Sequence, residues 1–253
     1  ISCSLVGSEM CIRDRNKTEE LQRIIAGRDK LYSVIAHDLR SPMGSIKMVL
    51  NMLMLNLPVE KIGAEMYELL TMANRTTEDV FSLLDNLLKW TKSQIGNLNV
   101  VYQDVDAVEV VDSVIDVFNM VAGLKKITIR EEKPEKLPVC TDIDMLKTII
   151  RNLLSNAIKF SNENSEVLVK MEEQGDTVVV SVKDSGCGID EEGQKKLLHT
   201  DTHFSTFGTN NEEGSGLGLL LCQDFAVKIG GKLWFTSKEG EGSTFYFSIP
   251  LKK

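Results

Sequence analysis

This chain of 253 residues has few of the features that identify membrane, nucleic-acid-binding, disulfide-rich or metal-binding proteins. No unbroken apolar run approaches the roughly 20 residues that a membrane-spanning helix needs, so we expect no membrane contact. Positive charge is in deficit, and the net charge of −8 disfavours a nucleic-acid groove as the main function. The cysteines are few, odd in number and scattered: Cys3, Cys11, Cys140, Cys187 and Cys222. They match neither a disulfide framework nor a metal-ligand spacing, which favours reduced thiols in the cytoplasm.

The start of the chain lacks the signals of an ordered element. Residues 1–15 show neither helical periodicity nor strand alternation, and they lack the basic start and long apolar centre of a secretory signal. We interpret them as a non-native leader or a disordered native linker and exclude them from the fold. The remaining length suits one large or two modest domains, and the 42% apolar content can fill ordinary cores.

Two long amphipathic runs follow, over residues 18–56 and 59–95. In the first run, apolar side chains recur in steps of three and four from Leu21 to Leu53, and Pro42 is expected to bend the helix. Two such helices joined by a short loop predict an antiparallel hairpin. One hairpin has too little apolar surface to bury against itself. We therefore predict that two copies pair into a four-helix bundle, which would make the protein a homodimer.

From Gly96-Asn97 onward, the pattern changes to alternating strands and helices. The predicted helices cover residues 107–124, 142–160 and 217–229, with a short one after Asp190. The predicted strands cover residues 99–103, 127–131, 165–173, 177–183, 232–237 and 243–249. Asp142 is the expected N-cap of its helix, and Gly175-Asp176 the expected turn of a hairpin. Hairpin-paired strands covered by helices on one face give an α/β sandwich, so the fold class is α+β.

The helix predicted over residues 142–160 has one apolar and one polar face. At 100° per residue, Asn156 lies about 40° from Asn152, and Lys159 lies about 20° from it on the other side. The opposite half carries apolar side chains: Leu146, Ile150, Leu153, Leu154 and Ala157. Carboxamide oxygens can hold Mg²⁺, and a lysine can neutralise phosphate oxygens. Taken alone, the pattern is also that of an ordinary solvated face.

Two glycine-containing motifs later in the sequence support a binding role for this face. Asp184-Ser-Gly-Cys-Gly188 directly follows a predicted strand, where a carboxylate can accept a hydrogen bond from a ring amine and glycines permit close approach. Gly214-Ser-Gly-Leu-Gly218 opens a predicted helix, whose free N–H groups can bind an anion. The irregular segment 198–215 before that helix, which contains Phe204 and Phe207, has the length and composition of a mobile lid. A capped tight turn and a disordered loop are the structural alternatives.

A further motif, His37-Asp-Leu-Arg-Ser-Pro42, lies in the first long helix. His37 lies 160–200° around the helix from Ile35 and Leu39, which puts its ring on the water-facing side. Asp38 can orient one ring nitrogen while the other acts as a nucleophile, and Ser41 lies one turn further on. An idle surface histidine is the alternative.

Taken together and in this order, the motifs resemble the catalytic core of a sensor histidine kinase, over roughly residues 18–253. The resemblance implies a dimerising, histidine-phosphotransfer hairpin over residues 16–97 and a Bergerat-type ATP-binding domain over residues 98–253. It also implies a cytoplasmic fragment of a longer, membrane-anchored receptor.

The resemblance implies a role for each motif. His37, oriented by Asp38, would take the γ-phosphoryl group of ATP and pass it to an aspartate of a response-regulator receiver domain. Asn156 would ligate Mg²⁺, and Asp184 would read the adenine amine. Residues implied beside the nucleotide are Asn152, Lys159, Phe160, Gly186, Gly188, Phe204, Phe207, Gly214, Gly216, Leu217 and Gly218.

Two residues depart from the family pattern. Asp38 stands where Glu is commoner, and Ser41 stands where members that dephosphorylate their partner carry Thr or Asn. Phosphatase activity is therefore left open. An ATPase clamp of the topoisomerase, mismatch-repair and chaperone kind is the main alternative, although those proteins lack a histidine-bearing hairpin. A binding-only pseudokinase is the other alternative, against which the intact Asn, Asp and Gly positions count.

Overall fold

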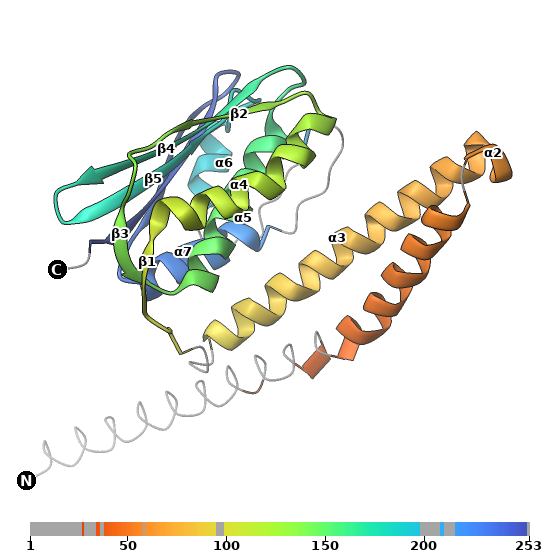
Figure 1. The fold of residues 1–253 in the computed structure, drawn as a ribbon, viewed down its shortest axis with the longest axis horizontal. Helices are drawn as coiled ribbons and strands as arrows, with labels where there is room; N and C mark the ends of the chain where they lie inside the picture. Colours follow the sequence, from red (N-terminus) through yellow and green to blue (C-terminus); the bar gives the residue numbers. More distant parts are fainter. Residues whose placement is uncertain are drawn as a thin grey trace, which may run out of the picture. The chain divides into compact units, whose positions relative to one another are not determined.

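The computed structural model places a helical region before an α/β region (Figure 1). It describes residues 38–57, 59–94, 99–197, 208–209 and 216–251, together with Gly27, Val34 and Ile35. The chain divides into two compact units, residues 1–98 and residues 99–253. Among the described helices, none combines the length and the apolar character that crossing a membrane requires.

The first unit is an antiparallel helical hairpin. Residues 38–56 are helical, and α2 (Val59–Ile62) and α3 (Ala64–Gln94) follow the turn. Our prediction of one continuous helix over residues 59–95 was wrong at Gly63, which has a φ of 80°. A residue in this left-handed conformation ends one helix and lets the next begin at a new angle.

Few apolar side chains of the hairpin are buried. Leu84 and Leu88 are 5% and 3% exposed and pack with Met43 and Leu87. Ion pairs join the two helices on the outside, between Arg40 and Asp85 and, at 3.3 Å, between Lys47 Nζ and Glu78 Oε1. Many apolar side chains of the hairpin remain exposed: Val34, Ile35, Leu39, Ile46, Met48, Val49, Met52, Leu53, Leu55, Met66, Leu69, Met72, Val80 and Leu83.

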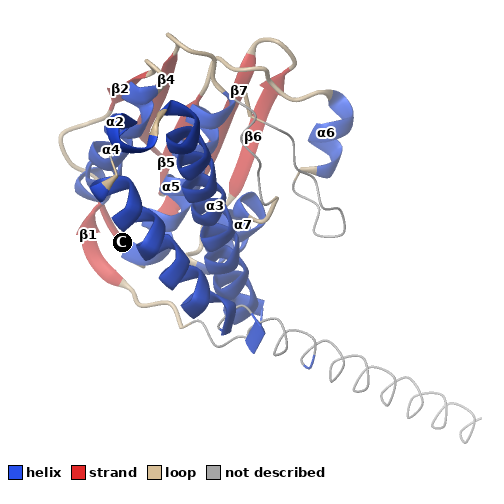
Figure 2. Ribbon diagram, turned by 90° about the vertical axis from the view of Figure 1, so that its right-hand side faces the viewer, coloured by secondary structure: helices blue, strands red, loops and turns tan. Residues whose placement is uncertain are grey.

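The second unit is built on a five-stranded mixed sheet (Figure 2). In spatial order its strands are β2 (Thr128–Glu132), β4 (Glu166–Gln174), β5 (Thr177–Lys183), β7 (Gly242–Pro250) and β6 (Leu233–Lys238). β2 pairs parallel with β4, and the other neighbours are antiparallel. In β5, the alternate residues Val178, Val180 and Val182 share one face and are at most 1% exposed, while Val179 on the other face is 5% exposed.

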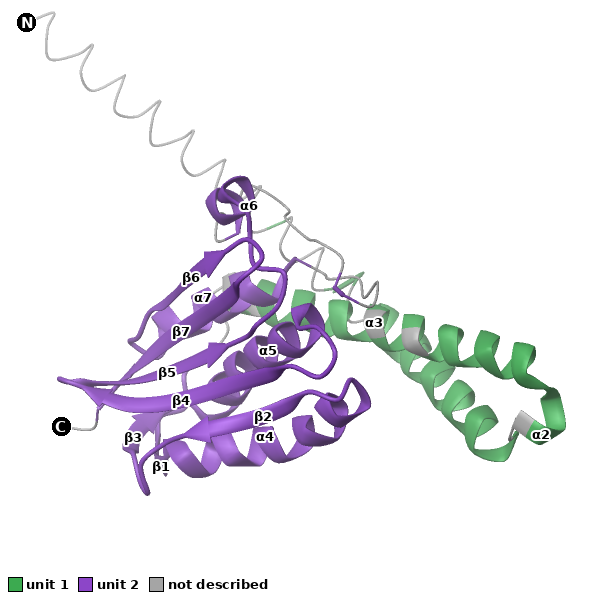
Figure 3. Cartoon of the chain, turned by 90° about the horizontal axis from the view of Figure 1, so that it is seen from above, with its two compact units in different colours: residues 1–98 green, residues 99–253 purple. Residues whose placement is uncertain are grey.

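Three helices cover one face of the sheet: α4 (Ala107–Leu124), α5 (Ile143–Phe160) and α7 (Gly218–Lys228) (Figure 3). A short α6 (Glu191–Lys196) follows its N-cap Asp190, as predicted. α5 is the central element of the core, and Ile149 and Leu153 are fully buried in it. Its N-cap is also as predicted, because Asp142 Oδ1 accepts hydrogen bonds from the N–H groups of Asp144 and Met145, both at 3.0 Å.

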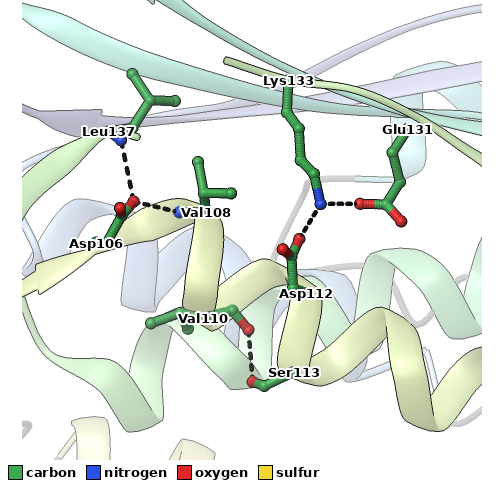
Figure 4. A network of polar contacts seen from close by, with 8 residues as sticks. All are labelled: Asp106, Val108, Val110, Asp112, Ser113, Glu131, Lys133 and Leu137. Carbon is green, nitrogen blue, oxygen red and sulfur yellow. Dashed lines mark hydrogen bonds and ion pairs between the residues drawn. The ribbon is translucent and has the colours of Figure 1, made fainter. Parts of the chain in front are cut away.

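The sequence prediction failed around a small second sheet. β1 (Gln103–Asp106) pairs antiparallel with β3 (Pro138–Thr141). We predicted the first strand at residues 99–103 and did not predict β3. Asp106 explains why β1 lies later in the sequence than the predicted strand. Its carboxylate caps α4 at Val108 N–H and also accepts from Leu137 N–H, both at 3.0 Å (Figure 4). This carboxylate fixes the end of β1 at the start of α4.

Candidate nucleotide-binding site

The polar face of α5 lies where the sequence placed it. The apolar side chains predicted for the opposite half are at most 3% exposed: Leu146, Ile150, Leu153, Leu154 and Ala157. Asn152, Asn156 and Lys159 are each half-buried. Asn152 Nδ2 donates to the carbonyl of Thr148 at 2.9 Å, which fixes the carboxamide along the helix. The face therefore presents two carboxamides and an ammonium in one line.

At the C-terminal end of α5, a cation lies over an aromatic ring. Lys159 Nζ is 5.0 Å from the centroid of the Phe160 ring, and Phe160 is half-buried. Such a contact is attractive and limits the directions in which the lysine can point. An ammonium and an aromatic ring thus lie together at the same end of the helix.

Asp184 is the most deeply buried carboxylate of the predicted site, at 4% exposed. Its Oδ1 accepts from the N–H groups of Gly186 and Ser243, at 2.9 and 3.1 Å. Burial raises the pKa of Asp184 above its ordinary value of 3.8, and the two backbone hydrogen bonds oppose that rise. The side chain is thus held in one position at the end of β5.

The glycines after Asp184 allow backbones to meet closely. A Cβ on Gly186 would lie 2.7 Å from the carbonyl carbon of Phe160 and closer still to its oxygen. Gly188 has a φ of 66°, and a Cβ there would overlap the carbonyl of Lys238. These positions require glycine for packing. Gly186 brings the loop after β5 against the end of α5, and Gly188 brings it against the end of β6.

The second glycine motif meets α5 directly. Gly216 has a φ of 65°, Leu217 precedes α7, and Gly218 is its first residue. A Cβ on Gly218 would lie 2.6 Å from Asn152 Oδ1, so the start of α7 packs against the polar face of α5. Among the described residues no side chain caps α7 at Leu217, and a helix N-terminus is a position at which backbone N–H groups can bind an anion.

Some predicted site residues lie outside the described residues: His37, Phe204, Phe207 and Gly214. Asp38 and Ser41 are both exposed on the helix of residues 38–56, in the first unit. Ser41 offers its carbonyl to Ser45 Oγ at 3.2 Å. Their catalytic roles stay predictions.

Sequence reasoning missed residues that complete the site. Ser243 binds Asp184, and Gly242, with a φ of 100°, lies so close to Asp184 that a Cβ there would meet its carbonyl carbon at 3.0 Å. The signal was present in Gly240-Glu-Gly242, a glycine pair at the start of β7. Lys125 and Thr209 also contact the end of α5, and no local pattern distinguishes either residue.

Comparison with known proteins agrees with this geometry. Residues 141–253 match the family described as histidine kinase-, DNA gyrase B-, and HSP90-like ATPase. The adaptive-response sensory kinase SasA of Crocosphaera subtropica is 28% identical over 249 residues, which cover 96% of this chain and 65% of that protein. The chain thus spans slightly less than two thirds of the length of this curated relative.

Two solved structures are similar. The catalytic domain of the histidine kinase ThkA is 30% identical, with a TM-score of 0.52 over 60% of this chain and 96% of that one. Full-length ShkA in complex with AMPPNP shares the fold, at 21% identity and a TM-score of 0.68, over 88% of this chain and 46% of that one. The chain carries the polar α5 face, the buried Asp184 and Gly218 in one unit, and these comparisons show that it belongs to the sensor histidine kinases and is a catalytic core of that family.

Proposed function

We propose that this chain binds Mg²⁺-ATP in its second unit, transfers the γ-phosphoryl group to His37, and passes it to an aspartate of a response-regulator receiver domain. The contact between Gly218 and Asn152 is the observation that carries the proposal. It sets the N-terminal end of α7, an anion-binding feature, beside the carboxamide face of α5. ShkA, which shares the fold, was solved in complex with AMPPNP, and this supports ATP as the ligand.

We assign the adenine end of the site to Asp184. The N–H groups of Gly186 and Ser243 both bind Oδ1, and we assign Oδ2 to the adenine amine. Gly186 and Gly188 would let the base approach the backbone. Phe160 would flank the nucleotide, and Phe204 and Phe207 would cover it. We assign the phosphate end to Lys159 and to the backbone of Gly214, Gly216, Leu217 and Gly218.

The side chains present suit Mg²⁺ held jointly with phosphates. Within the described residues no cluster of three or more His, Cys, Asp or Glu side chains could hold a metal alone. Mg²⁺ usually takes only one or two oxygens from a protein and the remainder from phosphates and water. The half-buried carboxamide of Asn156, one turn after Asn152, provides such an oxygen. We therefore propose Asn156 as the protein ligand.

When bound, ATP would supply the phosphoryl group, and the residues of the chain would position it and neutralise its charge. His37 would accept that group on a ring nitrogen, with Asp38 holding the other nitrogen and with Ser41 one turn away. Ser41 keeps a hydroxyl where phosphatase-active relatives carry Thr or Asn. Phosphatase activity accordingly forms no part of this proposal.

We propose that phosphotransfer and ATP binding belong to two separate domains, with the boundary at residue 97. Residues 16–97 would form the phosphotransfer hairpin, and residues 98–253 the ATP-binding domain. The exposed apolar side chains of the hairpin support a homodimer, because a second copy could bury them in a four-helix bundle. The cytoplasmic location and the longer, membrane-anchored receptor predicted from the sequence remain predictions.

The decisive experiment is incubation of the chain with Mg²⁺ and γ-labelled ATP. We expect acid-labile, base-stable labelling that His37→Gln abolishes without loss of ATP binding. His199→Gln and His203→Gln are matched controls and should still be labelled. The labelled chain should then pass its phosphoryl group to one member of a panel of receiver domains. Labelling that survives His37→Gln would contradict the proposal, and steady phosphate release independent of His37 would indicate an ATPase instead.

A further inference from the structure

Lys125 is a buried cation at the C-terminal end of α5. It directly follows α4 and is 7% exposed. Its Nζ donates to the carbonyls of Ile158 and Lys159, at 3.1 and 2.9 Å, and to Thr209 Oγ1 at 2.5 Å. An ammonium is costly to bury unless its N–H groups are paired, and the carbonyls at a helix C-terminus are favourable partners for it. Lys125 thus binds the last turn of α5 from the side of α4.

Thr209 binds the same turn. Its N–H donates to the carbonyl of Lys159 at 3.2 Å, and its hydroxyl donates to the carbonyl of Ser161 at 2.8 Å while accepting from Lys125. Every carbonyl in this arrangement belongs to residues 158–161. Two residues that are 84 positions apart in the sequence therefore hold one four-residue stretch between them.

This stretch carries the groups assigned to the nucleotide. The Lys159 ammonium and the Phe160 ring project from it, and the Phe160 carbonyl packs against Gly186, two residues after Asp184. A small rotation of the last turn of α5 would move the ammonium and the loop after β5 together. Neither Lys125 nor Thr209 needs to touch the nucleotide to influence it.

We propose that Lys125 and Thr209 are positioning residues for ATP, which fix the last turn of α5 so that Lys159 and the Gly186 loop are set before the nucleotide binds. This inference rests on the proposed function and extends it to a pair of residues outside the motifs. Preorganised groups bind more tightly because less freedom is lost on binding.

The test uses the full chain and isothermal titration with Mg²⁺-ATP. Lys125→Met keeps the length of the side chain and removes its charge, and Thr209→Val keeps the shape and removes the hydroxyl. We expect each variant to raise the Kd about tenfold, and the KM for autophosphorylation in parallel, with kcat at saturating ATP within about twofold of the unchanged chain. Thr209→Ser restores the hydroxyl and should restore the affinity. The double variant should raise the Kd by less than the product of the two single-variant increases, because both residues act on the same turn.

Two substitutions are matched controls. Lys136→Met removes a charge, and Thr128→Val removes a hydroxyl, at exposed positions. Neither should change the Kd.

A purely structural role for the pair would lower the thermal midpoint of the variants without changing the Kd measured well below it, and that result would overturn the inference. If Lys125→Met does not fold, Thr209→Val decides alone, and an unchanged Kd in that variant overturns it. If the unchanged chain binds no ATP, the proposed function fails as well. Normal ATP binding by the unchanged chain together with unchanged binding by both variants refutes only the positioning role.

Discussion

Gly218, the first residue of α7, lies directly against the side chain of Asn152 in the middle of α5. A Cβ on Gly218 would stand 2.6 Å from Asn152 Oδ1 and 3.5 Å from its Cγ. The carboxamide cannot simply swing away, because its Nδ2 is hydrogen-bonded to the carbonyl of Thr148. Two motifs that are far apart in the sequence therefore constrain each other at one point of contact.

Gly218→Ala should reduce ATP affinity much more than stability. The added methyl group displaces the carboxamide of Asn152, and we expect a loss of affinity of about tenfold, equivalent to about 1.4 kcal/mol. The free energy of unfolding should change little, because alanine favours a helix by up to about 1 kcal/mol and offsets part of the overlap. Titration with ATP and urea unfolding measure the two effects separately.

Gly123→Ala is the matched control for that substitution. Gly123 is exposed near the end of α4, and a Cβ there would meet nothing within 4 Å. The control should keep its ATP affinity and gain a few tenths of a kcal/mol in stability. Equal affinities in the two variants would contradict the contact as a determinant of binding.

Gly188→Ala should strongly destabilise the second unit. Gly188 combines a φ of 66° with backbone overlap, since a Cβ would lie 2.7 Å from the carbonyl carbon of Lys238. Gly175 has a similar φ of 62° at the turn between β4 and β5, but a Cβ there would meet nothing within 4 Å. We expect a loss of about 1–2 kcal/mol for Gly175→Ala from strain alone. Overpacking adds about 1–3 kcal/mol at Gly188, which gives a loss of roughly 2–5 kcal/mol in urea unfolding.

Asp184→Asn should stabilise the ATP-free chain near neutral pH while abolishing ATP binding. Burial raises the pKa of Asp184 above 3.8, so ionisation is less favourable in the folded state than in the unfolded state. Between the ordinary pKa of Asp184 and its pKa in the folded state, the folded chain binds more protons than the unfolded chain. The free energy of unfolding that Asp184 contributes therefore falls as the pH rises through this range. Asparagine keeps an oxygen for the N–H groups of Gly186 and Ser243 and removes the ionisation.

Urea unfolding at several pH values tests this expectation. The advantage of Asp184→Asn over the unchanged chain should be present at pH 7 and shrink as the pH falls toward the ordinary pKa of aspartate. Asp116→Asn, at an exposed position on α4, is the control and should show no such trend. A variant that is less stable than the unchanged chain at pH 7 would refute the prediction.

The sequence predicted those parts of the fold that local patterns determine. α4 begins and ends where predicted, and the polar face of α5 was readable because a helix fixes the angle between Asn152 and Asn156. β3 was missed because it is short, begins with Pro138 and pairs with distant segments, β1 and, through one bridge from Val139, Leu251, which local alternation does not reveal. The predicted strand at residues 99–103 failed for a similar reason, since the N–H of Val101 binds Asp142 Oδ2 at 2.8 Å.

The site was less predictable where distant residues meet. A lysine after a helix ordinarily predicts a solvated side chain, and the burial of Lys125 follows only from its contacts with α5 and Thr209. Ser243 likewise matters through a backbone N–H that any residue type carries. Motifs revealed the residues that would touch the nucleotide, and the fold was needed to reveal the residues that hold them.

The last prediction concerns the exposed apolar face of the hairpin. Leu69 on α3 is 55% exposed in a single chain, so replacing it removes little packing there. In a symmetric dimer Leu69→Lys would remove two buried leucines, at about 1.5–3 kcal/mol each, and should raise the dimer dissociation constant at least about 100-fold. Thr71→Lys adds the same charge at an exposed position about 200° around the helix and should leave the dimer intact.

Leu88→Ala separates folding from assembly. Leu88 is 3% exposed and packs inside one hairpin, so we expect it to lower the free energy of unfolding by about 2–5 kcal/mol. Leu69→Lys should instead keep its helix content, as circular dichroism reports, while sedimentation equilibrium shows a monomer. Since one hairpin leaves most of its apolar side chains exposed, a monomeric unchanged chain at micromolar concentration would mean that something other than a second copy covers them.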